Sequence, residues 1–175
     1  MTFAMVFPGQ GSQAVGMLGD WDHPAAAATL AEADQALGWD LSGLIARGPE
    51  AELNRTDRTQ PALLAVSIAL WRIWQAEGGA RPVAMAGHSL GEYSALAVAD
   101  VLSVRDTVRV VVEGGRLMQK ACDEKPGGMV ALIGIDEFAV EDVCRETGAQ
   151  LSNVNTAEQI IISGTHRSLA QAIDL

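Results

Sequence analysis

The sequence contains little that would build a metal site or a disulfide scaffold. Of its 175 residues, only two are cysteines, Cys122 and Cys144, and three are histidines. The cysteines lack the pairwise spacing of a zinc site, and two are too few for a disulfide framework. We therefore expect no metal ion and two reduced thiols, as in cytoplasmic proteins.

Positive charge is also scarce. The chain has 12 basic against 22 acidic residues, a net charge of −10, and only two lysines. This balance argues against nucleic acid as a main partner. The first basic residue is Arg47, so no positively charged segment precedes an apolar run, and no apolar run reaches about 18 residues. These absences predict a cytoplasmic localisation and no membrane partner.

The remaining composition suits an ordinary globular protein, with 49% hydrophobic and 19% charged residues. A short apolar run at residues 3–7 predicts a first buried strand of a parallel sheet, and a second run at residues 82–86 predicts another strand. Apolar periodicity and capping residues predict helices over residues 24–37, 59–76, 92–99 and 103–121. The order of elements predicts an α/β fold with a hydrolase-like parallel sheet.

The pattern changes after residue 125. A Pro-Gly-Gly joint leads into a β-α-β-β-α series, typical of a small ferredoxin-like α+β subdomain. We therefore divide the chain into a large subdomain, residues 1–125, and a small one, residues 126–175. The small series lacks a closing strand, so we expect both subdomains to be incomplete. Its strands are expected at residues 129–135, 151–154 and 160–163, and its helices at residues 137–147 and from Thr165.

A Gly-His-Ser-Leu-Gly motif at residues 87–91 lies between the second strand and a helix. This context is typical of a nucleophile elbow, in which a serine occupies a strained strand-to-helix turn and flanking glycines allow close backbone approach. Ser89 is therefore the candidate nucleophile. The alternative is that Ser89 only caps the helix. The dipole of a helix beginning at Ser89 would favour an oxyanion there, which suits acyl transfer.

Three segments together resemble the malonyl-CoA:acyl-carrier-protein transacylases, a family that includes the acyltransferase domains of fatty-acid and polyketide synthesis. They are Phe-Pro-Gly-Gln-Gly-Ser-Gln at residues 7–13, Thr-Gln-Pro-Ala-Leu at residues 59–63, and Gly-His-Ser-Leu-Gly-Glu-Tyr at residues 87–93. The resemblance covers the amino-terminal portion of the family. It therefore implies a missing carboxyl-terminal half as a further partner.

The resemblance implies that Ser89 takes a malonyl or other acyl group from coenzyme A and passes it to an acyl carrier protein in fatty-acid biosynthesis. The backbone N–H groups of Gln10 and Leu90 would form the oxyanion hole, and Gln60 would contribute more weakly to substrate binding. The coenzyme A thioester would be a substrate, so no permanently bound cofactor is expected.

The chain departs from the family at two points. The family's catalytic His lies beyond the last residue, so the base is absent from this chain, and the adjacent His88 is expected to pack locally. The Arg that binds the malonyl carboxylate falls at Gly114. Arg116 lies about 200° further around an ideal helix and does not replace it. We therefore expect carboxylated acyl groups to lose their anchor.

Two alternatives follow from the same residues. One is a catalytically impaired or inactive acyltransferase fragment, because a serine without its base retains only the help of the oxyanion hole and of binding. The other is a serine hydrolase or lipase, which shares the elbow but transfers the acyl group to water. The Gly-Gln-Gly-Ser-Gln loop at residues 9–13 argues against the hydrolase.

Overall fold

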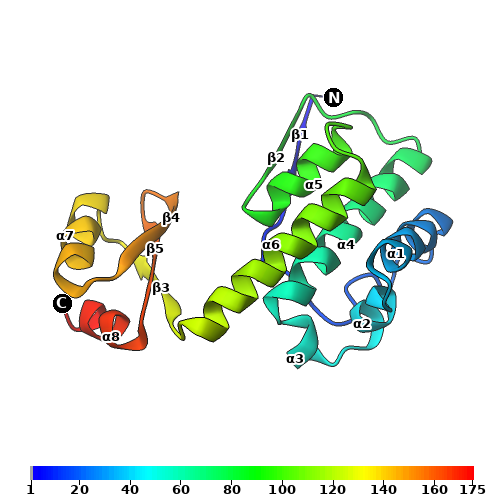
Figure 1. Ribbon diagram of the computed structural model, residues 1–175. Coiled ribbons are helices and arrows are strands. Elements are labelled where there is room, and N and C mark those ends of the chain that lie inside the picture. Colours follow the sequence, from blue (N-terminus) through cyan, green and yellow to red (C-terminus); the bar gives the residue numbers. More distant parts are fainter. Residues whose placement is uncertain (1) are drawn as a thin grey trace. The chain divides into compact units, whose positions relative to one another are not determined.

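The computed structural model describes residues 2–175. The chain divides into two compact units, Met1–Gln119 and Lys120–Leu175, each with its own hydrophobic core. The first unit contains, in order, β1 (Ala4–Phe7), α1 (Pro24–Leu37), α2 (Leu41–Arg47), α3 (Glu50–Leu53), α4 (Thr56–Ala76), β2 (Ala84–Gly87), α5 (Leu90–Val98) and most of α6 (Val104–Glu124) (Figure 1).

Helix α4 forms the centre of the first unit. It contacts α1, α2 and α3 on one side and α5 on another (Figure 1). It is buried around most of its circumference, as its nearly continuous apolar sequence predicts. Trp74 is an exception on this helix, because 41% of its surface is exposed. Its indole N–H donates to the carbonyl oxygen of Ala80 at 2.9 Å, which satisfies the polar end of the ring near the surface.

Strands β1 and β2 pair in parallel, with Phe7 opposite Gly87. One face of this pair is covered, because Phe7 packs in a cluster with Trp71 of α4 and Val98 of α5. The other face is open within residues 2–175, and Val6 is 75% exposed. The expectation of a buried first strand is therefore wrong for the Val6 side and correct for Phe7. The α/β class and the parallel pairing agree with the sequence.

The second unit contains β3 (Gly128–Ile133), α7 (Glu137–Thr147), β4 (Gln150–Thr156), β5 (Gln159–Gly164) and α8 (His166–Asp174). The strands form an antiparallel sheet in the order β3-β5-β4. Ile160 and Ile162 of β5 are fully buried, and they pack with Val140 of α7 and Leu169 of α8. Both helices therefore cover the face of the sheet to which Ile160 and Ile162 point.

The helices with clear end signals have the predicted bounds. Helix α7 begins after Asp136, whose carboxylate accepts hydrogen bonds from the N–H groups of Phe138 and Ala139. It ends at Gly148, which has the left-handed conformation of a C-terminal cap. The short helices α2 and α3 were not predicted. Asp40 caps α2 by accepting a hydrogen bond from Gly43 N at 2.6 Å. The apolar periodicity used to predict helices does not detect such a cap.

No helix in residues 2–175 is both long and apolar enough to cross a membrane. The same residues contain no cluster of three or more His, Cys, Asp or Glu side chains that could hold a metal ion. Both cysteines are free, with Cys122 exposed and Cys144 partly buried. Burial, and secondarily the charge of Glu141, raises the pKa of the Cys144 thiol.

Candidate active site

Ser89 lies at the junction between β2 and α5 in a backbone conformation that is rare for a residue with a side chain. Its φ is 53° and its ψ is −114°. Such a conformation costs on the order of 1–3 kcal/mol and occurs most often at functional sites. Ser89 occupies the N-cap position of α5, but its hydroxyl makes no capping hydrogen bond. Ser89 is an exposed residue, and no capping role occupies its hydroxyl.

Two glycines allow this junction to be tight. A Cβ on Gly87 would overlap the carbonyl group of Gly91, and a Cβ on Gly91 would overlap the carbonyl oxygen of Phe7. The start of α5 therefore lies directly against the end of β1. Larger residues at either position would push the helix away from the strand and change the conformation of Ser89.

The parallel register brings the loop after β1 and the turn after β2 to the same edge of the sheet, because Phe7 pairs with Gly87. A Cβ on Gly9 would lie only 2.7 Å from the carbonyl oxygen of His88. Gln10 follows Gly9, and Leu90 is the first residue of α5. Within residues 2–175, the backbone N–H groups of Gln10 and Leu90 donate to no protein acceptor. Two unpaired donors therefore flank the edge where Ser89 lies.

None of the three histidines is hydrogen-bonded to Ser89 in the part of the chain that the structure describes. The ring of His88 lies beside Gly9, where a Cβ would be 2.9 Å from Nδ1, and its backbone N donates to Phe7 O at 3.3 Å. His23 caps α1 and contacts Glu77 at 3.3 Å. His166 is the first residue of α8, in the other compact unit.

The Gln10 loop is attached to the start of α4 by amide side chains. The Gln10 Nε2 donates to Thr56 Oγ1 at 3.2 Å, and its Oε1 accepts from Gln60 Nε2 at 2.9 Å. Three residues later, Gln13 Nε2 donates to Asn54 Oδ1 at 2.8 Å. Gln60 is 6% exposed. Its amide therefore contacts the loop from a buried position.

Helix α6 passes close to the same turn of α4 at Gly115. A Cβ on Gly115 would lie 3.2 Å from the carbonyl oxygen of Thr56 and 3.5 Å from Cγ of Gln60. By contrast, a Cβ on Gly114 would meet nothing within 4 Å. The two consecutive glycines do not interrupt α6. A side chain at residue 114 would therefore have room, whereas a side chain at residue 115 would be crowded by the first turn of α4.

Arg116 is engaged elsewhere on the surface of α6. Its guanidinium donates to both carboxylate oxygens of Glu113, from Nε at 2.9 Å and from Nη2 at 2.6 Å. This pairing lowers the pKa of Glu113 and raises that of Arg116. Arg116 therefore forms a local helix pair.

Thr56 and Gly115 complete the neighbourhood of the Gln10 loop, and sequence reasoning missed both. Thr56 precedes Gln60 by one helical turn, so the two side chains lie on one face of α4. That spacing was a usable signal. Gly115 had no comparable signal, because its role depends on the approach of α6 to Thr56.

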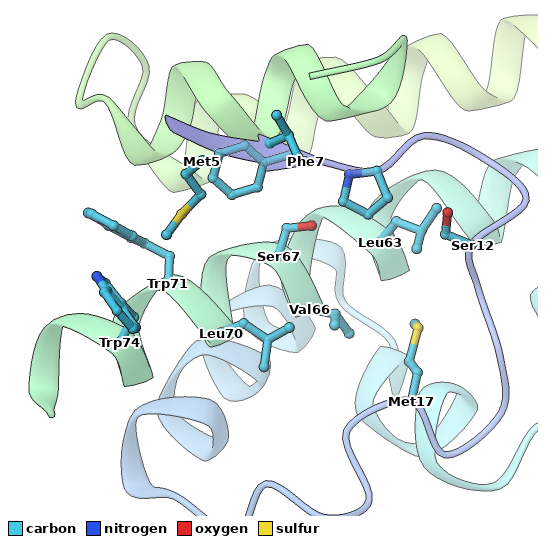
Figure 2. A pocket seen from close by; sticks show the side chains of 12 residues that line it. Met5, Phe7, Ser12, Met17, Leu63, Val66, Ser67, Leu70, Trp71 and Trp74 are labelled. Atoms are coloured by element: carbon cyan, nitrogen blue, oxygen red, sulfur yellow. The ribbon is translucent and has the colours of Figure 1, made fainter. Parts of the chain in front are cut away.

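An apolar pocket of about 420 Å³ lies beside this loop, between β1 and α4. Figure 2 shows Met5 and Phe7 on one side of it, facing Leu70 and Trp71 on the other. Ser12 of the loop lies at one end. The pocket therefore joins the covered face of β1 to the Gln10 loop. Its other lining residues are Val6, Pro8, Met17, Leu63, Val66, Ser67 and Trp74.

Comparison with known proteins identifies close relatives. The malonyl CoA-acyl carrier protein transacylases of Salmonella typhimurium and of Escherichia coli strain K12 are each 49% identical over 176 residues, which cover 97% of this chain. A malonyl-transacylase solved in complex with a type II polyketide synthase acyl-carrier protein is 48% identical, with a TM-score of 0.93 over 99% of this chain and 58% of that one. An acyl carrier protein S-malonyltransferase from Vibrio cholerae is 44% identical, with a TM-score of 0.90 over 98% of this chain and 58% of that one.

The chain spans 57% of the length of the curated relatives from Salmonella typhimurium and Escherichia coli. The model of a protein family, described as the acyl transferase domain, matches residues 4–175. That match includes Gln10, Gln60, Ser89 and Gly114. The chain therefore belongs to the acyl transferase domain family.

Proposed function

We propose that the protein transfers an acyl group from a coenzyme A thioester to an acyl carrier protein through an ester on Ser89. The observation that carries this proposal is the conformation of Ser89, an exposed residue with φ of 53° whose hydroxyl makes no capping hydrogen bond at the start of α5. A nucleophile elbow has this arrangement. The cost of holding such a backbone conformation favours a functional over a purely structural role.

The proposed reaction has two steps of the same kind. The Ser89 oxygen bonds to the thioester carbonyl carbon, the carbon–sulfur bond breaks, and coenzyme A leaves as a thiol that carries the proton lost by the hydroxyl. The thiol of the carrier's phosphopantetheine then attacks the ester, and Ser89 regains a proton. Both steps pass through a tetrahedral oxyanion, and neither needs a permanently bound cofactor.

We assign the stabilisation of that oxyanion to the backbone N–H groups of Gln10 and Leu90. Both lack a protein acceptor in residues 2–175, and both flank the edge that carries Ser89. The positive end of the α5 dipole supports the same assignment. Removing one donor of this kind typically costs about 10²–10³ in rate.

The carrier protein and the place in fatty-acid biosynthesis are proposed from the relatives. Two are named malonyl CoA-acyl carrier protein transacylases, and a third was solved bound to an acyl-carrier protein. The acyl group itself is a separate question. The family resemblance places the carboxylate-binding Arg at residue 114, where this chain has an uncharged glycine. The nearby Arg116 is paired with Glu113. We therefore propose a weaker preference for malonyl than a side-chain guanidinium would give.

The finer architecture is also a proposal. Residues 1–125 would form the hydrolase-like large subdomain with the nucleophile elbow, and residues 126–175 the small ferredoxin-like one. The parallel pairing of β1 with β2 supports the former. The strand order β3-β5-β4, with α7 and α8 packed against β5, supports the latter.

Intact-protein mass spectrometry after exposure to malonyl-CoA and to acetyl-CoA tests the function. The wild-type chain should gain the mass of one acyl group, and Ser89→Ala should gain none. Ser152→Ala is the matched control, since Ser152 is an exposed serine of the other compact unit, and it should label like the wild type. Adding carrier protein with its phosphopantetheine arm should then remove the acyl group from Ser89 and place it on the carrier.

The other outcomes identify the alternatives. Release of free acid at the rate of thioester consumption, with no acylated carrier, would indicate a serine hydrolase. No adduct with either thioester would indicate a chain without transferase activity. Labelling that persists in Ser89→Ala would contradict the assignment of the nucleophile.

A further inference from the structure

The side-chain amide of Gln60 binds another residue of the proposed site. Its Nε2 donates to Gln10 Oε1 at 2.9 Å, while the other end of the same Gln10 amide donates to Thr56 Oγ1 at 3.2 Å. Gln60 itself is 6% exposed and Thr56 is half-buried. The side chain of an exposed loop residue is thus fixed at both ends by two residues of one helix face.

Besides the Gln10 amide contacts, this loop has a second attachment, because the Gly11 N–H donates to Gln13 Oε1 at 2.8 Å and Gln13 is bound to Asn54. Gly11, with φ of 107°, and the exposed Ser12 follow Gln10 directly. Glycine in this region adopts many conformations at little cost. The amide contacts of Gln10 act directly on the residue whose backbone N–H is the proposed oxyanion donor, so they restrain its peptide group.

Helix α6 packs against Thr56 and Gln60, the two residues that hold the Gln10 amide. Gly115 approaches the carbonyl oxygen of Thr56 and Cγ of Gln60 so closely that a Cβ would lie at 3.2 and 3.5 Å from them. This packing limits the movement of the first turns of α4. The position of the Gln10 N–H is therefore set by a short series of contacts that runs from α6 through α4 to the loop.

We propose that Gln60 is a positioning residue, which acts with Thr56 by holding the Gln10 side chain so that the Gln10 backbone N–H stays at the oxyanion position. The proposal rests on the proposed function for its catalytic meaning. It changes the expected role of Gln60 from a weak contact with substrate to an anchor for the oxyanion-hole loop. Because an oxyanion donor acts only when it is preorganised, looseness at Gln10 should slow acylation of Ser89.

Two variants of Gln60 test this idea. Gln60→Met keeps the length of the side chain and removes the donor. Gln60→Glu keeps the shape and a hydrogen-bond partner, because the Gln10 amide can rotate so that its Nε2 donates to the carboxylate and its Oε1 accepts from the Thr56 hydroxyl. Ser67→Ala is the control, because Ser67 is also buried on α4 but belongs to the neighbouring pocket. Two readouts are needed: the ¹⁵N order parameter of the Gln10 amide, and the initial rate of Ser89 acylation by acetyl-CoA.

In Gln60→Met, we expect the order parameter of Gln10 to fall from about 0.85 toward 0.6, and acylation to slow by about 10- to 100-fold. Gln60→Glu should stay closer to the wild type than Gln60→Met in both readouts, because its carboxylate still holds the Gln10 amide. Gln10→Met removes the contacts with both Gln60 and Thr56, so it should slow acylation at least as much as Gln60→Met, and adding Gln60→Met to it should cost nothing further. Ser67→Ala should match the wild type in both readouts.

An unchanged order parameter in Gln60→Met would overturn the proposal, whatever the rate. A lowered order parameter with an unchanged acylation rate would overturn it too, since positioning would then have no catalytic effect. If the wild type takes up no acyl group at all, the proposed function fails. The order parameter would then decide separately whether Gln60 fixes the Gln10 peptide.

Discussion

Gly91 lies so close to the carbonyl oxygen of Phe7 that no side chain fits between them. This contact joins the first turn of α5 to the last residue of β1. It also places the turn that carries Ser89 next to the loop that carries Gln10, because Phe7 is paired with Gly87 in the parallel register. Four predictions test the consequences of this arrangement and of the contacts around it.

The Gly91→Ala substitution should destabilise the first unit by roughly 3 kcal/mol or more, since the methyl group meets backbone atoms that cannot move independently. Gly114→Ala is the matched control on another helix. It should stabilise the chain by about 1 kcal/mol, because its Cβ meets open space and alanine favours a helix over glycine. Urea denaturation measures both. Equal effects at the two positions would contradict the close approach of α5 to β1.

Replacing Ser89 by Gly should release backbone strain that replacing it by Ala retains. Glycine adopts a positive φ without steric cost, whereas alanine keeps the Cβ that makes φ of 53° unfavourable. We expect Ser89→Gly to be more stable than Ser89→Ala by about 1 kcal/mol. Thermal unfolding of the two variants under identical conditions provides the comparison. If Ser89→Ala proved the more stable, the turn would not be strained.

Introducing a guanidinium at residue 114 should change the choice of acyl group. Gly114→Arg should be tolerated, because a Cβ there has open space around it. A hydrogen bond to a charged group is worth about 1.5–3 kcal/mol, so the malonyl-to-acetyl ratio of Ser89 adducts should rise by roughly 10- to 100-fold. Gly114→Gln controls for side-chain size without charge. A similar ratio in both variants would refute a carboxylate site at this position.

The stability that Asp57 contributes should depend on pH. Arg55 hydrogen-bonds to the Asp57 carboxylate at 3.1 and 3.2 Å and lowers the pKa of that group. A lowered folded-state pKa gives a contribution that is complete above the unfolded pKa of about 3.9 and is lost as the pH falls through the folded-state pKa. Asp57→Asn should therefore cost about 0.5 kcal/mol at pH 7 and progressively less below pH of about 4.

Urea denaturation at a series of pH values measures that difference. Asp174→Asn, in the last turn of α8, controls for the change in net charge. A cost for Asp57→Asn that stayed constant down to pH of about 3 would show that its carboxylate is not stabilised by Arg55.

Local signals accounted for the elements that were predicted well. Helix α7 has both its cap at Asp136 and its terminating Gly148 in the sequence, so its bounds follow from residues that contact their own neighbours. The junction at Ser89 is similar, because an apolar strand, two glycines and a helix are all adjacent in the chain. Such features can be recognised over a few residues, although the close approach of Gly91 to Phe7 is a remote contact.

The features that were missed depend on remote contacts. Val6 has the same apolar character as Phe7, yet only Phe7 is covered, because Trp71 and Val98 come from elements far along the chain. Thr56 meets the Gln10 side chain only after the loop after β1 has folded onto the start of α4. No local pattern specifies which of these surfaces will meet.

The sequence by itself determined the family, the candidate nucleophile at Ser89 and the uncharged residue at Gly114, since motif and spacing are properties of the chain. Only the tertiary structure decided that Ser89 is strained and uncapped, that Gln60 contacts Gln10, and that Gly114 faces open space whereas Gly115 does not. The physical reason is that a motif specifies local conformation. Which side chains have room, partners or solvent is decided by how distant elements pack.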